Sequence, residues 1–398
     1  MDTKNKLDLE NNKKKETRKT SGKTKRSFKD FMLGIKSKIS LSLVVIFWLS
    51  ITLVAWTRPA DSISEHERRP LEQLPALEVK EILSGQYMKD FEEYAKDQFP
   101  SRFGFRSIKS LLRYYVFLQS DNNDIFIHDK YASKLEFPMS ESSINLAGKK
   151  FSEIYEKYLK DTNTKNYLSI IPDKNFYLAK PNGYPSMDYD LLFELIKRET
   201  GFAQFIDIRD TLKLEDFYKT DTHWKQEALL PTVKKILKEM NMLDYFAFDY
   251  EKKMAEIDFY GVYYGQSALP LKPEKIYYLT NIHTQDSQVF NLENNSYTSV
   301  YDMDRLQGND PYDIFLSGAS ALLVVENPHA TSDKELVIFR DSFGSSISPL
   351  FLEGYSKVTL VDIRYIASDL IGRFIDFENQ DVLFLYSALI LNRSATFK

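Results

Sequence analysis

Four short apolar runs constrain the fold of this chain more than any other feature. They lie at residues 321–326, 336–340, 358–363 and 382–387, and each is mostly apolar and continuous, without the alternation of a half-exposed strand. Strands that are buried on both faces have this pattern. Strand-like and helical segments also alternate along the preceding part of the chain. The sequence therefore predicts an α/β domain over residues 121–398, with a doubly wound, mostly parallel sheet covered by helices on both faces.

The N-terminal region predicts a membrane anchor. Residues 39–56 contain no charged residue in 18 positions, and as a helix they would span about 27 Å, close to the thickness of a hydrocarbon core. Residues 1–38 carry 13 Lys or Arg against 5 Asp or Glu, and this basic tail with few aromatic residues is predicted to be disordered. The positive-inside rule places the tail in the cytoplasm and the chain beyond about residue 57 outside.

A cleaved signal peptide and a buried helix are the alternatives to this anchor. A signal peptide has a shorter charged region, an apolar stretch of about 7 to 15 residues, and small residues at its cleavage site. The apolar run here is longer, and "WTRPADS" after it is a poor cleavage site. We therefore expect an uncleaved, single-pass transmembrane helix in the cell membrane, followed by an extracytoplasmic domain.

Residues 57–120 are predicted to form a linker followed by amphipathic helices. The stretch "TRPADSISEHERRPLEQLPAL" is polar, contains three prolines and lacks helical periodicity, as expected of an extended linker. The segments "YMKDFEEYAKDQF" and "FRSIKSLLRYYVFL" then place apolar residues near helical spacing. We expect these two helices to pack against the main domain.

The composition excludes several classes of protein. The chain has no cysteine, which removes disulfides, thiolate nucleophiles and cysteine-based zinc sites. Its net charge of −4 gives no general attraction to nucleic acid. Neither a dinucleotide glycine fingerprint nor a P-loop is present. We therefore expect no cofactor, no metal and no nucleic-acid partner.

A serine follows one of the predicted buried strands. In "ELVIFRDSFGSSI" the strand at residues 336–340 leads into Ser342, and a helix is expected to begin near Phe343. Parallel α/β sheets bind ligands at the carboxyl ends of their strands, and a helix N-terminus there favours an oxyanion. The alternative is that Ser342 or Asp341 only caps the helix.

The stretch "FYKTDTHW" supplies the groups that a serine nucleophile needs. A serine is a weak nucleophile until a nearby base removes its proton. His223 is the candidate base, and Asp221 is placed to accept the other imidazole N–H and fix the tautomer. No second histidine or cysteine lies at ligand spacing from His223, so a metal role has no support.

These motifs resemble the alginate O-acetyltransferase-like SGNH proteins, including the DHHW group. The resemblance rests on "KTDTHW" followed by "VIFRDSFGSSISPL", and it extends over roughly residues 60–395 through "HERRPLEQLPAL", "SIIPDKNFYLAK" and "PYDIFLSGASALLVVEN". It implies an SGNH-like fold and a triad of Asp221, His223 and Ser342, in the order Asp, His, Ser. The DHHW group is named for two consecutive histidines, and Thr222 stands at the first of these positions.

The resemblance implies a membrane-anchored, extracytoplasmic serine O-acetyltransferase that works through an acyl-serine. The acceptor would be an exopolysaccharide or a cell-wall glycan, with acetyl groups supplied by a membrane-bound O-acyltransferase. A carbohydrate acetylesterase of the same fold and a non-catalytic glycan-binding scaffold are the alternatives.

Four further residues are weaker candidates for substrate binding. Arg340 either binds an acidic sugar or pairs with a carboxylate, and pairing is favoured. Trp224 either stacks on a sugar or packs beneath the motif. Tyr264 belongs to "FYGVYYGQSAL", a predicted loop that the resemblance places near the site as a source of a second oxyanion donor. Asn327 ends a predicted strand on the ligand face, or is only a turn former.

Overall fold

The computed structural model describes residues 11–12, 32–33, 35–64 and 66–398. The predicted disorder of residues 1–38 falls mostly outside the described residues. The chain divides into two compact units. The first comprises the described part of Met1–Ser62 together with Leu71–Arg102, and the second comprises Ile63–Pro70 and Phe103–Lys398.

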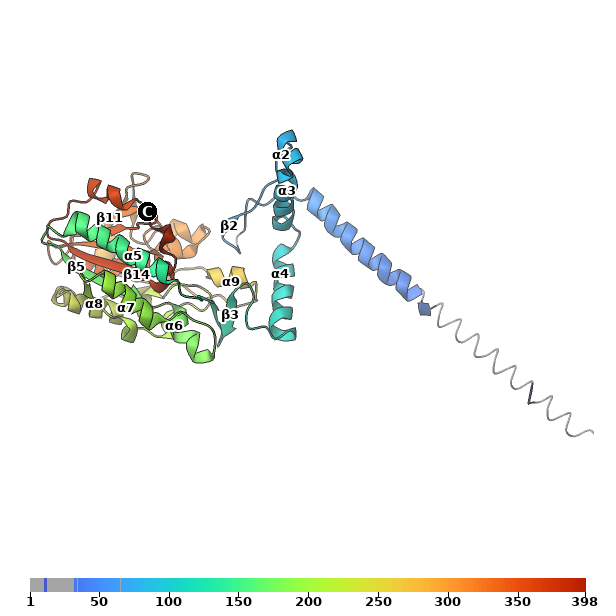
Figure 1. Cartoon of the computed structure of the whole chain (residues 1–398), viewed down its shortest axis with the longest axis horizontal. Helices are drawn as coiled ribbons and strands as arrows, with labels where there is room; N and C mark the ends of the chain where they lie inside the picture. Colours follow the sequence, from blue (N-terminus) through green and yellow to red (C-terminus); the bar gives the residue numbers. More distant parts are fainter. Residues whose placement is uncertain (1–10, 13–31, 34, 65) are drawn as a thin grey trace, which may run out of the picture. The chain divides into compact units, whose positions relative to one another are not determined.

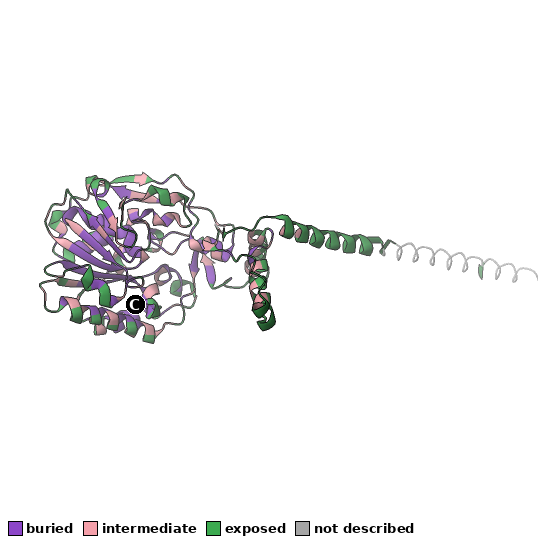
Figure 2. Ribbon diagram, turned by 90° about the horizontal axis from the view of Figure 1, so that it is seen from above, coloured by how far each residue is buried: buried purple, intermediate pink, exposed green. Residues whose placement is uncertain are grey.

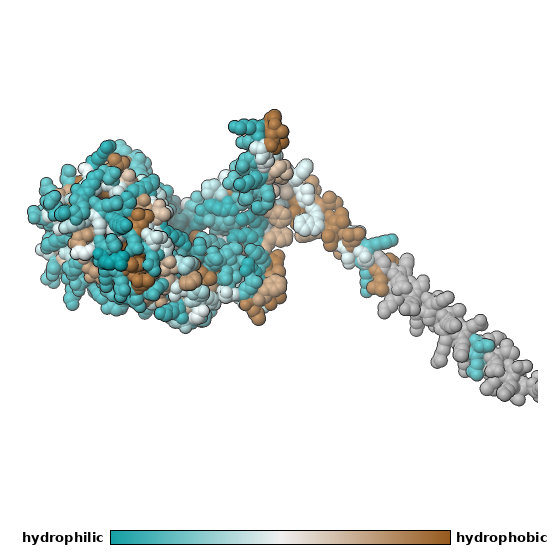
Figure 3. All heavy atoms as spheres, viewed as in Figure 1, coloured by the Kyte–Doolittle hydropathy of each residue, from teal (hydrophilic) through white to brown (hydrophobic). Residues whose placement is uncertain are grey.

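The first unit contains a long apolar helix, Ile35–Thr57, which includes the uncharged run noted above. Its length of 23 residues and the mean hydropathy of 2.3 over an 18-residue window within it are sufficient to cross a membrane, and Figure 3 shows its apolar surface in brown. Helices of this kind occur both in membrane anchors and in signal sequences. The unit also contains the amphipathic helices α2 (Val79–Ser84) and α3 (Gln86–Asp97).

The second unit is built on one large sheet (Figure 1). Within the described chain its eight strands have the order β10-β9-β11-β13-β12-β14-β5-β6. The five strands from β13 to β6 are all parallel, so the prediction of a mostly parallel sheet is confirmed. The strands are β5 (Lys165–Ile171), β6 (Gln204–Phe205), β9 (Gln288–Asn291), β10 (Ser296–Ser299), β11 (Leu322–Glu326), β12 (Glu335–Arg340), β13 (Lys357–Val361) and β14 (Asp381–Ser387).

The first of the four apolar runs differs from its prediction. It forms β11, which pairs antiparallel with β13, with Leu322 opposite Val361 and Glu326 opposite Lys357. The strands β9 and β10 continue the antiparallel part of the sheet. A continuous apolar run records burial on both faces, which is the same for either strand direction. The carboxyl end of β11 therefore lies at the edge where β12 and β13 begin.

Side chains of the parallel strands alternate between two apolar layers. Leu336 and Ile338 of β12 pack with α8 (Leu230–Glu239) on one face. Val337 and Phe339 of the same strand pack on the other face with α5 (Glu141–Ile154) and α7 (Tyr189–Glu199). Figure 2 shows the buried residues gathered on the sheet between these layers. The double coverage explains the continuous apolar runs.

Pro231 lies at the start of α8, where its missing N–H costs nothing. The remaining helices of the second unit include α4 (Arg102–Leu111), α6 (Lys174–Leu178), α9 (Val262–Ser267), α10 (Ile282–Asp286), α11 (Ser342–Ile347) and α12 (Ala388–Leu391).

Among the described residues, three two-stranded antiparallel sheets lie outside the large sheet. They are β1 (Ile63–Ser64) with β2 (Arg69–Pro70), β3 (Ile125–His128) with β4 (Tyr131–Lys134), and β7 (Glu251–Met254) with β8 (Tyr277–Thr280). The first of these falls within the segment expected to be an extended linker. Residues 63–70 are therefore folded into the second unit.

A substitution at Phe384 tests the packing of the core between β14 and α5. It is fully buried and stacks on Phe339, with ring centroids 4.7 Å apart. Replacing Phe384 with alanine leaves a cavity in a packed layer and is expected to cost about 3–5 kcal/mol of unfolding free energy. The matched control is Phe374→Ala, because Phe374 is 48% exposed and its loss is expected to change stability by less than about 0.5 kcal/mol. Urea unfolding followed by intrinsic fluorescence would contradict this packing if both variants behaved alike.

Candidate active site

Ser342 is the first residue of α11, directly beyond the carboxyl end of β12. Asp341 is the N-cap: its Oδ1 accepts the Phe343 N–H at 3.0 Å, and its Oδ2 accepts the Ser387 N–H at 2.8 Å. These bonds tie the helix start to the end of β14. Asp341 thus does the capping, and the half-buried hydroxyl of Ser342 is left for another partner.

The turn into α11 depends on Gly344. A Cβ at this position would lie 2.6 Å from the Cβ of Arg340, which is too close for any two side-chain carbons. Glycine allows the helix to start directly against the strand it follows. This close approach holds Ser342 at the edge of the sheet.

His223 lies between Asp221 and Ser342. Its Nδ1 is 2.7 Å from Asp221 Oδ1, and its Nε2 is 2.8 Å from Ser342 Oγ. An ionised carboxylate only accepts hydrogen bonds, so Nδ1 carries the proton and Nε2 is the acceptor. The Ser342 hydroxyl therefore donates to Nε2, and the three side chains form one continuous hydrogen-bond chain.

Burial and charge act on Asp221 in opposite directions. Complete burial raises the pKa of the Asp221 carboxyl, but the hydrogen bond and charge of His223 and the charge of Arg68 outweigh burial and lower it below its usual value. Asp221 is therefore ionised throughout the neutral range. An ionised carboxylate at Nδ1 fixes the tautomer in which Nε2 is free to accept a proton.

The loop that carries Asp221 and His223 is closed by its own backbone. Phe217 and Trp224 form an isolated antiparallel bridge, and the Tyr218 N–H donates to the His223 carbonyl at 3.1 Å. Asp221 Oδ1 also accepts the His223 N–H at 3.0 Å. The stretch "FYKTDTHW" is thus a compact turn whose geometry presents the imidazole outward.

Lys174 of α6 holds the same loop by hydrogen bonds to its backbone carbonyls. Its buried ammonium donates to the carbonyls of Tyr218 at 2.8 Å and Asp221 at 2.7 Å, with Lys219 at 3.3 Å. Burial lowers the pKa of Lys174 to about 7, and the nearby carboxylate of Asp221 opposes the shift. A single side chain therefore satisfies three carbonyls of the loop.

The start of α9 packs against the loop from the other side. The Val262 N–H donates to Asp221 Oδ2 at 2.9 Å, and the Gly261 N–H donates to Thr220 Oγ1 at 3.0 Å. A Cβ on Gly261 would lie 2.3 Å from the Thr220 carbonyl, so glycine is needed for this approach. The segment expected to supply a second oxyanion donor instead uses these two N–H groups to hold Asp221 and its loop.

An aromatic ring fixes the plane of the imidazole. The ring of Tyr312 stacks on His223 with centroids 4.0 Å apart and an angle of 10° between the planes. The Tyr312 hydroxyl donates to Ser346 Oγ at 2.7 Å, and the Trp224 Nε1–H donates to the same oxygen at 2.9 Å. Ser346 of α11 therefore links both aromatic residues to the helix that carries Ser342.

Two of the weaker substrate-binding candidates are buried in the protein. Arg340 is fully buried, with Nη1 donating to Ser345 Oγ at 2.9 Å. Trp224 is also fully buried against Phe343 and Ser346. Neither side chain has surface for a glycan to touch. This is the packing alternative for Trp224, whereas Arg340 donates to hydroxyl and carbonyl oxygens and not to the carboxylate that was expected.

The other two candidates lie apart from the hydrogen-bond chain. Tyr264 lies within α9, not in a loop, and contacts Tyr260 and the His66 ring. Asn327 donates to the Leu352 carbonyl at 2.6 Å. It follows the antiparallel strand β11 and lines a pocket with Glu335 and Lys357, the first residues of β12 and β13. Its expected place on the ligand face is therefore wrong.

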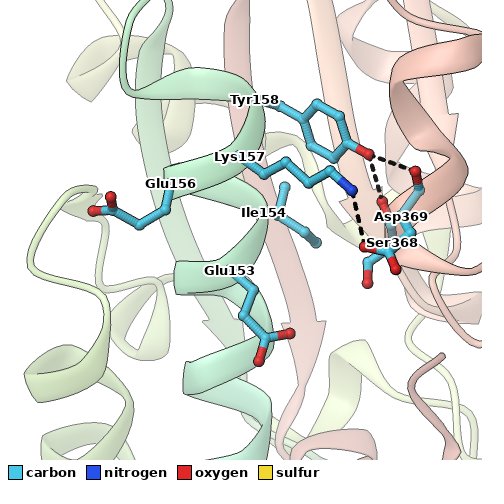
Figure 4. A pocket seen from close by; sticks show the side chains of 7 residues that line it. All are labelled: Glu153, Ile154, Glu156, Lys157, Tyr158, Ser368 and Asp369. Carbon is cyan, nitrogen blue, oxygen red and sulfur yellow. Dashed lines mark hydrogen bonds and ion pairs between the residues drawn. The ribbon is translucent and has the colours of Figure 1, made fainter.

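A surface pocket of about 390 Å³ lies between η2 (Tyr155–Leu159) and η11 (Ser368–Arg373). Figure 4 shows Lys157 and Tyr158 reaching toward Asp369, with the Lys157 ammonium 2.9 Å from the carboxylate. No predicted site residue lines this pocket. An exposed ion pair of this kind contributes little, so we assign the pocket no role in the candidate site.

Several residues of the site were not identified from the sequence. They are Arg68, Lys174, Asp310 and Tyr312, together with the backbone of Val262. Lys174 carried a usable signal, since it follows the predicted strand in "NYLSIIPDK" and so belongs to the ligand edge. Arg68, Tyr312 and Val262 lie in stretches quoted above, but no local pattern in these stretches assigns the residues to the site.

Comparisons with known proteins identify the family that the chain resembles. The DHHW protein family model matches residues 191–361, a range that contains Asp221, His223 and Ser342. The resemblance inferred from the sequence motifs is thereby confirmed. No curated protein matches the chain in sequence.

Solved structures share the fold. A DHHW family protein from Eubacterium siraeum matches with a TM-score of 0.52 and 17% identity, over 68% of this chain and 93% of that chain. PatB1 from Bacillus cereus matches with a TM-score of 0.53 and 17% identity, over 67% and 96%. PatB1 with a sulfonyl adduct matches with a TM-score of 0.52 and 18% identity, over 67% of this chain and 97% of that chain. The O-acetyltransferase domain of Pseudomonas putida AlgJ has a TM-score of 0.42 and 10% identity, over 67% of this chain and 92% of that chain.

Lys174→Met tests whether the buried ammonium holds the site. Loss of three charged hydrogen bonds is expected to cost about 3 kcal/mol of stability, and displacement of the loop is expected to slow the reaction of Ser342 with a sulfonyl fluoride by about 10- to 100-fold. The matched control is Lys253→Met, since Lys253 lies on β7 and its side chain is 38% exposed. Labelling followed by peptide mapping measures the rate. Equal rates for the two variants would contradict a role for Lys174.

Proposed function

We propose that the protein is a membrane-anchored, extracytoplasmic serine O-acetyltransferase that acts on an exopolysaccharide or cell-wall glycan. The observation that carries this proposal is the hydrogen-bond chain from Asp221 through His223 to Ser342. The DHHW family match and the resemblance to alginate O-acetyltransferase-like proteins support the acetyl group as the one transferred. The apolar helix Ile35–Thr57 supports anchoring.

Acetyl transfer proceeds in two steps on this geometry. In the first, His223 Nε2 takes the proton of Ser342 Oγ, which attacks the carbonyl carbon of the acetyl donor. The tetrahedral intermediate collapses when His223 returns the proton to the departing oxygen, which leaves acetyl-Ser342. In the second, an acceptor hydroxyl gives its proton to His223 and attacks the carbonyl carbon of acetyl-Ser342. The bond from that carbon to Ser342 Oγ then breaks, His223 returns the proton to Oγ, and the acetylated acceptor leaves.

The surroundings of His223 suit both steps. The buried carboxylate of Asp221 stabilises the imidazolium that forms transiently, and Tyr312 prevents the ring from rotating out of line. The N-terminus of α11 lies beneath Ser342 and favours the developing oxyanion. A membrane-bound O-acyltransferase is the proposed source of acetyl groups, because the proposed site faces away from cytoplasmic acetyl donors.

A carbohydrate acetylesterase is the second candidate. The same three residues serve hydrolysis when water replaces the sugar hydroxyl, and the half-buried position of Ser342 leaves its oxygen within reach of solvent. Transfer instead of hydrolysis requires an acceptor bound so that it excludes water. A non-catalytic scaffold is disfavoured, because a scaffold gains nothing from a buried carboxylate aligned on a histidine.

Substitutions in the hydrogen-bond chain test the proposed chemistry. Full-length protein in detergent is expected to release the chromophore from an acetyl ester. Ser342→Ala and His223→Ala are expected to lower kcat by about 10⁴-fold or more, and Asp221→Asn by about 10³- to 10⁴-fold. Ser296→Ala, in the exposed hairpin β9–β10, is the matched control. A Ser342→Ala variant with wild-type turnover would refute the assignment.

The fate of the acetyl group separates transfer from hydrolysis. With candidate glycans present, a transferase is expected to form acetylated glycan at the expense of free acetate while ester consumption continues. The measurement is the ratio of the two products, by mass spectrometry, as the glycan concentration rises. Acetate as the sole product at every glycan concentration would favour the esterase.

A further inference from the structure

We propose that Arg68, at the end of the β1–β2 hairpin, is a positioning residue that balances the carboxylates beside His223. This inference rests on the proposed function, because it concerns how the base of that reaction is kept neutral and aligned. It assigns a role to the short hairpin that follows the N-terminal apolar helix in sequence. The hairpin would thus complete the active site of the second unit.

Arg68 reaches two carboxylates of the site. Its Nη1 is 2.7 Å from Asp310 Oδ1 and 3.6 Å from Asp221 Oδ2. Its Nη2 donates to the carbonyl of Tyr260, and its guanidinium lies 5.4 Å from the centre of the Phe259 ring. The side chain is only 9% exposed, so an external anion has almost no access to it. The contacts identify an internal counter-ion.

Asp310 connects Arg68 to the ring that stacks on His223. Besides the ion pair, Asp310 Oδ1 accepts the Tyr312 N–H at 3.0 Å. Arg68 therefore holds Asp221, which bonds to one edge of the imidazole. Through Asp310, it also holds the backbone of Tyr312, whose ring stacks on the face of the imidazole. The guanidinium thus contacts one support of the imidazole, Asp221, directly and is linked to the other, Tyr312, through Asp310, as its planar fork of donors allows.

The charge balance around His223 depends on this cation. The charged and titratable groups around His223 are Asp221, Asp310 and Asp313, with Arg68, Lys174 and Tyr312. Without the positive charge of Arg68, the net charge contributed by Asp221 and Asp310 beside His223 would be more negative. Added negative charge favours the protonated imidazole, and a protonated His223 cannot accept the serine proton.

The hairpin is held firmly enough to act in this way. Glu67 pairs with Arg106 of α4, and the His66 ring stacks on Phe103 with centroids 3.9 Å apart. A Cβ on Gly265 of α9 would lie 1.7 Å from the His66 carbonyl oxygen, so the hairpin backbone lies directly on that helix. Arg68 itself has a φ of 53°, a left-handed conformation that a non-glycine residue keeps only when its contacts hold it.

The test measures the rate at which a sulfonyl fluoride labels Ser342 in the full-length protein, from about pH 5 to pH 9. This readout needs neither acetyl donor nor glycan. For Arg68→Met we expect the acid limb of the profile to move up by about one pH unit, so that labelling near pH 6 falls by about 10-fold while the alkaline plateau changes less. Arg68→Lys, which keeps the charge, is expected to show a smaller shift.

Two further variants separate charge balance from a structural role. Arg69→Met is the matched control, because Arg69 lies in the same hairpin and its guanidinium pairs with Glu67. In Arg68→Met/Asp310→Asn, the second carboxylate loses its charge and keeps an oxygen that can accept the Tyr312 N–H. We expect this double variant to return the acid limb toward its wild-type position. Thermal unfolding confirms that each variant is folded.

Two results would overturn the inference. One is a wild-type pH profile for Arg68→Met. The other is an equal loss of rate at every pH that Asp310→Asn does not reverse. The proposed function fails separately: wild-type protein that labels at Ser342 with the expected dependence on Arg68, yet turns over no acetyl ester, would leave the role of Arg68 standing and remove the acetyltransferase.

Discussion

The hydrogen bond between the buried carboxylate of Asp221 and Nδ1 of His223 is the interaction on which the candidate site depends. Burying a carboxylate away from water costs free energy unless its charge is compensated. The imidazole, the Val262 N–H and the guanidinium of Arg68 compensate the charge of Asp221. Because Asp221 is ionised, the imidazole proton stays on Nδ1. The free Nε2 is therefore aligned on Ser342 before any substrate arrives.

The fold brings the residues of this hydrogen-bond chain together from separate helices, strands and loops. The parallel strands β12 and β14 end at the same edge, and Asp341 joins them there, so Ser342 is fixed by the sheet. The loop with His223 is not part of the sheet and is held by Lys174 and the start of α9. A serine fixed by the sheet and a histidine held by its loop suit the proposed reaction, in which water or a sugar hydroxyl is the acceptor.

Sequence patterns predicted the parts of the molecule that are encoded locally. A buried strand followed at once by Asp-Ser and a helix start gave the position of Ser342, and a histidine two residues after an aspartate gave its partners. The direction of β11 had no local signal, because burial on both faces looks the same in either direction, and Asn327 was misplaced with it. Arg68 reaches the site from a proline-containing segment 153 residues before Asp221 in the chain, and only the folded structure connects them.

The acyl-serine is the central claim, and its direct capture is the measurement to make. Full-length protein would be mixed with an acetyl ester, quenched in acid within the first turnover, digested and mapped by mass spectrometry. The account predicts an acetyl group on the peptide that contains Ser342, and its loss when an acceptor is added before the quench. Acetyl turnover with Ser342 unmodified, or with the acetyl group on another residue, would contradict it.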